Sequence, residues 1–254
     1  AEASFANEGA RQPKLDLRFD WDPSPQRGFS YRVGVAGTSG IMHSGIGPFS
    51  IDPDTRQSYA ELAYRGPRLD AKVYANDIDG QATNLLNALP FVFKNRTHVV
   101  DATWMTPLSD RHLLLVGGNA RVNAFDLSLA PGESRRDEAG AFVEDQRHFQ
   151  HGILSLGLRV DWFDTVGTTF SPRTSFVWKP RERQSVRFAF NRAFRSPSLI
   201  NNFLDTAVPN IVTLDPSNPP FVFVTFAKGN ADAREETVDA FEIGRTIEAG
   251  ASVI

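Results

Sequence analysis

The chain has 254 residues, a formal net charge of −3 and a pI near 6.0, so it lacks the basic stripe that nucleic-acid binding requires. It contains no cysteine, which excludes both a disulfide framework and a thiolate metal site. No apolar run approaches the roughly 18–20 residues of a membrane-spanning helix, whereas the strands of a membrane barrel need only about 9–11 alternating residues.

Segments of alternating polar and apolar residues follow one another along the chain. In residues 14–21, apolar residues at every second position alternate with charged ones. A period of two places the two sets on opposite faces of a strand. The segment from His112 either continues to Asp126 as one strand or breaks at Gly117-Gly118. The other predicted strands are residues 29–37, 58–64, 68–75, 96–105, 140–146, 152–161, 173–179, 185–191 and 237–245.

The connections between these strands alternate between short and long. Short turns are expected near residues 23, 67, 107, 148 and 181, and long connections near residues 45, 84, 132, 167 and 210. The long connection over residues 76–95 is expected to contain a short helix, Ala82–Leu89. Tight turns on one rim and long loops on the other are typical of an up-and-down barrel, whereas a Greek-key sandwich does not sort its loops in this way.

The longest connection, residues 196–234, contains an aromatic segment. Phe221, Phe223 and Phe226 form either a short β-hairpin inside this loop or an aromatic platform for a ligand. We favour the hairpin.

Residues 170–199 form a hairpin that carries a recognisable motif. It contains S-P-R, then K-P, then R-F-A-F-N-R-A-F-R-S-P-S-L, and Gly229-Asn230, Glu235-Glu236 and F-E-I-G at residues 241–244 follow downstream. Their order and spacing resemble the barrel of TonB-dependent outer-membrane receptors, with Phe241 where the family more often has Tyr. The similarity continues upstream through Gly118-Asn119, residues 141–145 and residues 159–161, and so covers most of the chain.

The resemblance implies an all-β fold, an antiparallel up-and-down transmembrane β-barrel. About 11–12 strands are predicted, out of the roughly 22 in large outer-membrane transporters. Residues 1–254 would then be a partial barrel domain, an internal fragment without its plug domain and closing strands. Half a barrel leaves two open edges that hydrocarbon does not tolerate, so we do not expect the fragment to be a stable membrane protein alone.

The resemblance also implies a function. The intact protein would sit in the outer membrane of a Gram-negative bacterium, in contact with its lipid, and would import a scarce nutrient such as a siderophore, haem, cobalamin or an oligosaccharide. TonB would supply the energy through the missing plug segment. The implied protein is a monomer when intact, is not an enzyme, and needs neither a cofactor nor nucleic acid.

Candidate binding residues lie on the polar face of the motif hairpin and at the start of the longest loop, since loops on a rigid scaffold often carry recognition. They are Arg187, Asn191, Arg192, Arg195, Asn201 and Asn202. Asp205 follows in the same loop. A structural interpretation competes for the polar-face residues, together with Arg121, Arg159 and Arg173: they line the lumen and pair with acidic residues across strands or with a plug.

Other functions remain open at this point. A passive porin or an adhesin would have the same fold. A soluble β-sandwich binding module is the alternative from another class, and it predicts that Leu15, Leu17, Phe19 and Trp21 are buried against a second sheet. No nucleophile, base and orienting group occur in a usable arrangement. His148 and His151 are close in sequence but lack a third metal ligand, which favours a solvated turn.

Overall fold

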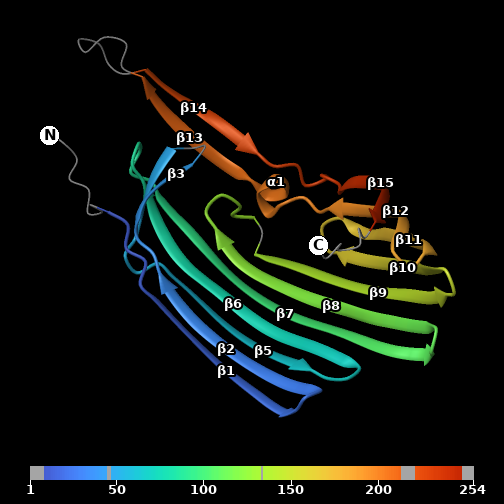
Figure 1. The fold of residues 1–254 in the computed structure, drawn as a ribbon. Helices are drawn as coiled ribbons and strands as arrows, with labels where there is room; N and C mark the ends of the chain where they lie inside the picture. Colours follow the sequence, from blue (N-terminus) through green and yellow to red (C-terminus); the bar gives the residue numbers. More distant parts are fainter. Residues whose placement is uncertain (1–8, 45–46, 133, 213–220, 248–254) are drawn as a thin grey trace, which may run out of the picture.

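The computed structural model describes residues 9–44, 47–132, 134–212 and 221–247. In this part of the chain the main element is one curved antiparallel sheet of 13 strands, accompanied by a separate two-stranded hairpin (Figure 1). Eleven of the sheet strands are neighbours in chain order. They are β1 (Lys14–Ser24), β2 (Arg27–Gly37), β5 (Arg56–Arg65), β6 (Leu69–Asn84), β7 (Pro90–Ser109), β8 (His112–Leu127), β9 (Arg135–Phe149), β10 (Gly152–Phe163), β11 (Gly167–Arg181), β12 (Gln184–Arg195) and β15 (Glu236–Ile247). This confirms the predicted all-β, up-and-down topology.

Two long connections contain hairpins of their own. Between β2 and β5, strand β3 (Gly40–Ser44) pairs with β4 (Gly47–Ile51), and β4 also pairs with the end of β6. Between β12 and β15 lie the short helix α1 (Leu199–Phe203) and the hairpin of β13 (Asp205–Val212) and β14 (Phe221–Lys228). The hairpin predicted around the three phenylalanines is therefore confirmed. Neither α1 nor any other helix in the described ranges has the length and apolar character needed to cross a membrane.

The two ends of the sheet differ in their connections. At one end, two or three residues join consecutive strands, and we call this the turn rim. At the other end, which we call the loop rim, the connections have five or more residues and include both hairpins, except that only residues 164–166 join β10 to β11. The predicted sorting of connections is confirmed except near residue 167, where the expected long connection is only residues 164–166. The helix expected at Ala82–Leu89 is wrong, since β6 runs to Asn84 and only residues 85–89 separate it from β7. Strand β8 passes through Gly117-Gly118 without a break.

One face of the sheet is apolar and uncovered. Leu15, Leu17, Phe19 and Trp21 of β1 have 56–66% of their surface exposed, and they pair in register with Val35, Val33, Tyr31 and Phe29. A soluble protein rarely exposes a continuous apolar patch of this kind. No second sheet covers this face in the described structure, so the sandwich interpretation is wrong.

The height of the apolar face matches a membrane. Trp178 lies near the turn rim on β11, and Trp162 lies on β10 opposite Thr168, which is ten residues further along β11. Ten residues span about 33 Å along a strand, and a tilt of about 45° reduces this to about 23 Å, close to the apolar band of about 25 Å in membrane barrels. The two tryptophans are therefore placed like the aromatic belts at the two interfaces.

The opposite face is polar, and we call it the polar face. Here Arg32 lies 3.7 Å from Glu61 of the next strand, and the Thr97 hydroxyl bonds to the buried Asn123 at 2.8 Å. Strand alternation alone separates these residues from their apolar neighbours. In a membrane barrel such a face lines the lumen.

Candidate functional site

The predicted residues of β12 lie on two faces of the strand, since Arg192 is one position out of step with Arg187, Asn191 and Arg195. Arg187 and Asn191 are on the polar face, where Arg187 Nη1 is 3.8 Å from Glu242 Oε2 of β15. Arg192 and Arg195 were expected at the start of the loop, but this is wrong because β12 and β15 stay paired up to Arg195. Arg192 Nε lies 2.6 Å from Asp239 Oδ1, and Arg195 Nε lies 3.8 Å from Glu236 Oε2.

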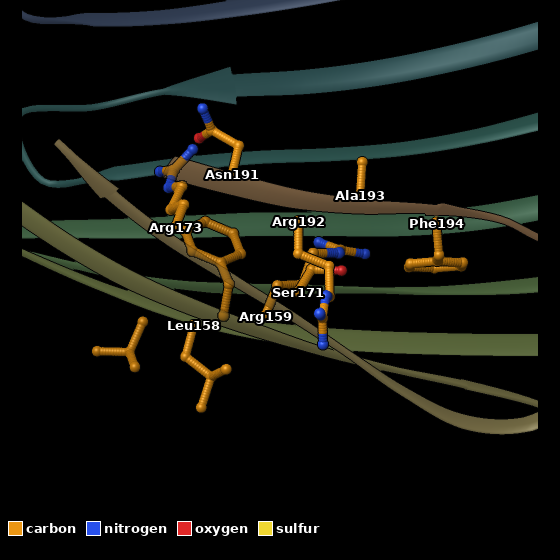
Figure 2. A pocket seen from close by; sticks show the side chains of 10 residues that line it. Leu158, Arg159, Ser171, Arg173, Asn191, Arg192, Ala193 and Phe194 are labelled. Atoms are coloured by element: carbon orange, nitrogen blue, oxygen red, sulfur yellow. The ribbon is translucent and has the colours of Figure 1, made fainter. Parts of the chain in front are cut away.

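A cavity of about 420 Å³, which we call the polar cavity, opens where β12 separates from β11. The pairing of β11 with β12 ends at Arg173 and Asn191, and beyond this point Phe194 packs edge-on against Phe163 with ring centroids 5.5 Å apart. Figure 2 shows the side chains that line the resulting space, which include Arg159, Ser171, Arg173, Asn191, Arg192 and Phe194. Two of the predicted binding residues of β12, Asn191 and Arg192, thus line one cavity, although their side chains point to opposite sides of the strand (Figure 2).

Acidic and amide groups hold the arginines of the polar cavity in place. Arg159 donates to Asp161 and to Asn119, both at 2.7 Å, and Arg173 contacts Glu144. The expected cross-strand pairing with acids is therefore confirmed for Arg173 and, on β12, for Arg187. Among the described residues the buried Ser171 hydroxyl has no protein partner. Guanidinium groups beside a hydroxyl favour a ligand that carries hydrogen-bond acceptors or negative charge.

Asn201 and Asn202 lie on α1, whose first turn is capped by the Ser198 hydroxyl (3.1 Å from Asn201 N). Asn202 is 3% exposed, and its amide donates to the Asn230 carbonyl at 3.3 Å. Asn230 N in turn donates to the Asn201 carbonyl at 2.8 Å. Asn202 therefore tethers the helix to the Gly229-Asn230 motif, while the Asn201 side chain is exposed.

The glycine of this motif is required by close backbone approach. Gly229 N donates to the Leu204 carbonyl at 2.6 Å, and a Cβ on Gly229 would lie 2.6 Å from the Asn202 carbonyl oxygen. Only a residue without a side chain fits here. The downstream half of the sequence motif thus closes the base of the long loop onto α1.

A second cavity, of about 510 Å³, lies at the loop rim, and we call it the apolar cavity. Several parts of the chain build it: the β3–β4 hairpin, the loop-rim ends of β6 and β7, the β8–β9 connection, the segment around α1 and the β13–β14 hairpin. Its lining includes Phe49, Phe91, Phe93, Ile200, Leu204 and Ala227. Nothing in the sequence pattern singled out this cavity, since its parts are far apart in the chain.

The described ranges contain no group of three or more His, Asp or Glu side chains that could hold a metal ion. His148 lies near the end of β9 and His151 lies in the turn that follows. The exposed aromatic residues of β14 include Phe226, which is 71% exposed.

Comparison with known proteins identifies the fold independently. The profile of the family described as "TonB dependent receptor-like, beta-barrel" matches residues 4–246. No curated protein sequence matches the chain.

Several solved structures share the fold at low sequence identity. The siderophore receptor PirA from Pseudomonas aeruginosa has a TM-score of 0.72 at 17% identity, over 95% of this chain and 44% of that one. A ferric enterobactin receptor mutant (PfeA) from Pseudomonas aeruginosa, in complex with enterobactin, has a TM-score of 0.71 at 16% identity, over 94% of this chain and 41% of that one. The FrpB iron transporter from Neisseria meningitidis has a TM-score of 0.64 at 17% identity, over 95% of this chain and 43% of that one.

The chain therefore spans less than half the length of these three receptors. The family match extends over nearly all of the sequence, and the sorted connections, the uncovered apolar face and the polar face agree with it. The chain belongs to the β-barrel family of the TonB-dependent receptors.

Proposed function

We propose that the intact protein imports a ferric siderophore across the outer membrane of a Gram-negative bacterium, with energy supplied through TonB. The observation that carries this proposal is the family match, combined with two cavities, one at the gap between β11 and β12 and the other at the loop rim. The names of the similar structures, two siderophore or enterobactin receptors and an iron transporter, favour an iron chelate over haem, cobalamin or an oligosaccharide.

In this proposal each surface of the chain has its own role. The apolar face contacts lipid. Apolar side chains suit this position because a charged residue facing lipid would cost about 2–4 kcal/mol at mid-membrane. The loop rim faces the outside and captures the ligand with Asn201, Arg195 and the residues around the apolar cavity. Arg187 and Asn191 of β12 offer hydrogen bonds on the polar face, deeper in the barrel, whereas Arg192 lies on the opposite face of the strand, paired with Asp239. A plug and further strands, supplied by the rest of the protein, close the lumen and connect it to TonB, and the receptor works as a monomer.

The proposal is tested by iron-limited growth. The intact gene is expressed in a strain that lacks its own ferric siderophore receptors, once with and once without functional TonB, and a panel of ferric siderophores, haem, cobalamin and oligosaccharides is supplied. We expect growth on a ferric siderophore only when TonB is present.

Each other outcome points to a different function. Uptake that does not need TonB would overturn the proposal and indicate a passive porin. TonB-dependent uptake of haem, cobalamin or an oligosaccharide would retain the receptor but overturn the choice of ligand. Surface attachment without uptake would favour an adhesin.

A further inference from the structure

The loop rim contains a buried positive charge that no sequence motif predicted. Arg136, near the start of β9, is 6% exposed. Its guanidinium carbon lies 5.6 Å from the centre of the Phe163 ring, and its Nε is 3.1 Å from Glu138 Oε1. Removing such a charge from water is costly unless its N–H donors find hydrogen-bond acceptors. The acceptors of the remaining guanidinium N–H groups therefore show which part of the chain stabilises the buried charge.

Those groups bind the long loop rather than the sheet. Nη1 of Arg136 donates to the Pro197 carbonyl at 2.9 Å, and Nη2 contacts the Ser196 hydroxyl. Both acceptors belong to the S-P-S segment directly after β12. The planar guanidinium can reach two acceptors at once, which a lysine ammonium does not reproduce.

The contact is transmitted to α1 over a single residue. Ser198 follows Pro197 and caps the helix through its hydroxyl and its carbonyl, which accept from Asn201 N and Asn202 N. At the other end of the helix, Asp205 N donates to the Leu129 carbonyl at 2.8 Å. The helix is thus held at its start by β9 and at its end by the β8–β9 connection.

This placement determines one wall of the apolar cavity. Ile200 and Leu204, from α1 and the residue after it, face the cavity whose other side includes Phe49 and Phe93. A helix of five residues is too short to hold its own position in water, so the position of this wall depends on the contacts at its ends.

We infer that Arg136 is a positioning residue that holds α1 as the wall of the apolar cavity and thereby sets the shape of the ligand-capturing rim. The inference extends the proposed function, but it concerns the geometry of the loop and can be tested without a ligand. Failure of the uptake experiment therefore leaves this test intact, and the reverse is also true.

The test measures the position of α1 in the intact protein. Because this chain has no cysteine, spin labels can be attached at Asn201→Cys on α1 and Leu89→Cys in the β6–β7 connection, both exposed positions. The distance distribution between the labels is recorded by pulsed electron paramagnetic resonance. In Arg136→Gln we expect at least about tenfold more of a displaced population, because two hydrogen bonds to a charged group are lost.

Arg135→Gln is the matched control. Arg135 is the neighbouring residue on the same strand, is exposed and pairs with Asp137 rather than with the loop, so its replacement should leave the distribution unchanged. Arg136→Lys, which keeps the charge but not the fork, should restore the native distance only in part.

Two outcomes would overturn the inference. One is an unchanged distribution in a folded Arg136→Gln protein, and the other is an equal shift in Arg135→Gln. If Arg136→Gln does not yield folded protein, Ser196→Ala replaces it, since it removes one loop contact and keeps the charge paired with Glu138. A distribution for Ser196→Ala that equals that of the unsubstituted protein would likewise overturn it.

Discussion

The polar cavity and the apolar cavity differ in how they are built. The polar cavity is lined by strand residues such as Arg159 and Arg173, whose direction follows from alternation and whose charges are held by acids of the same sheet. The apolar cavity is formed by several segments that are distant in the chain, and one wall depends on α1. Strands therefore supply the chemistry of the lumen, whereas the loops determine the shape of the rim.

The difference determines how well each cavity keeps its shape when a residue is substituted. A strand residue of the polar cavity is supported by two neighbouring strands, and loss of one ion pair leaves the ladder intact. The wall of the apolar cavity has a few contacts at each end of a short helix, so one clash at its base should displace it. Substitutions at the two cavities should therefore differ in effect.

We expect the largest effect from Gly229→Ala. The added Cβ would meet backbone atoms of Asn201 and Asn202 at 2.6–2.8 Å, and backbone cannot give way as a flexible side chain can. Steric overpacking of this kind costs about 1–3 kcal/mol. The loss should appear in the loop and not in the barrel, as faster hydrogen exchange over residues 196–204 with unchanged exchange in β6–β8.

Gly132→Ala is the control for this substitution. Gly132 lies in the β8–β9 connection on the same rim, and its Cβ would meet nothing within 4 Å. Exchange over residues 196–204 should remain unchanged in this variant. Equal protection of the loop in both variants would show that α1 does not depend on its contact with the Gly229-Asn230 motif.

The same contrast explains what the sequence predicts. Alternation placed Arg173 and Asn191 on one face and the apolar residues of β1 on the other, because the period of a strand is local. It could not find the apolar cavity, since Phe93 and Ile200 meet only through the fold. Arg136 was missed for the same reason, because its partners follow β12 while it lies on β9.

Two local errors also have physical causes. The apolar residues of Ala82–Leu89 resemble one face of a helix, but residues 82–84 belong to β6, where pairing with β7 continues to Thr83. Arg192 and Arg195 stand close to Pro197, a residue that ends ladders, yet pairing with β15 keeps both in β12 up to Arg195. In each case a long-range ladder overrides a local signal.

An intermediate effect is expected from filling the apolar cavity. Ala227 of β14 lines it, and Ala227→Trp would occupy part of its about 510 Å³ without removing any polar contact. If the cavity receives part of the ligand, import of the iron chelate that supports growth should fall about tenfold, equivalent to about 1.4 kcal/mol, while the amount of folded receptor is unchanged.

The hairpin offers its own control for this variant. Ala207 of β13 is exposed and lies opposite Phe226, on the other face of the hairpin from the paired residues Thr206 and Ala227. Ala207→Trp adds the same side chain but leaves the cavity open, so import should be unaffected. Equal import by the two variants would exclude the apolar cavity from the path of the ligand.

The smallest effect is expected at the exposed ion pair between Arg187 and Glu242. Both side chains are 55% exposed and the charged atoms are 3.8 Å apart, a geometry that contributes at most about 1 kcal/mol because water screens it. Arg187→Gln should therefore hardly change the free energy of unfolding, measured by urea titration of the intact barrel in lipid vesicles.

Arg173→Gln provides the comparison, since its partner Glu144 is only 16% exposed and would remain as a largely buried carboxylate without its cation. We expect the second variant to lose more stability than the first, and Glu144→Gln combined with Arg173→Gln to recover part of the loss because the unpaired charge is then gone. Equal losses for Arg173→Gln and Arg187→Gln would mean that water reaches both pairs alike, and that the polar cavity is as open as the rest of the lumen wall.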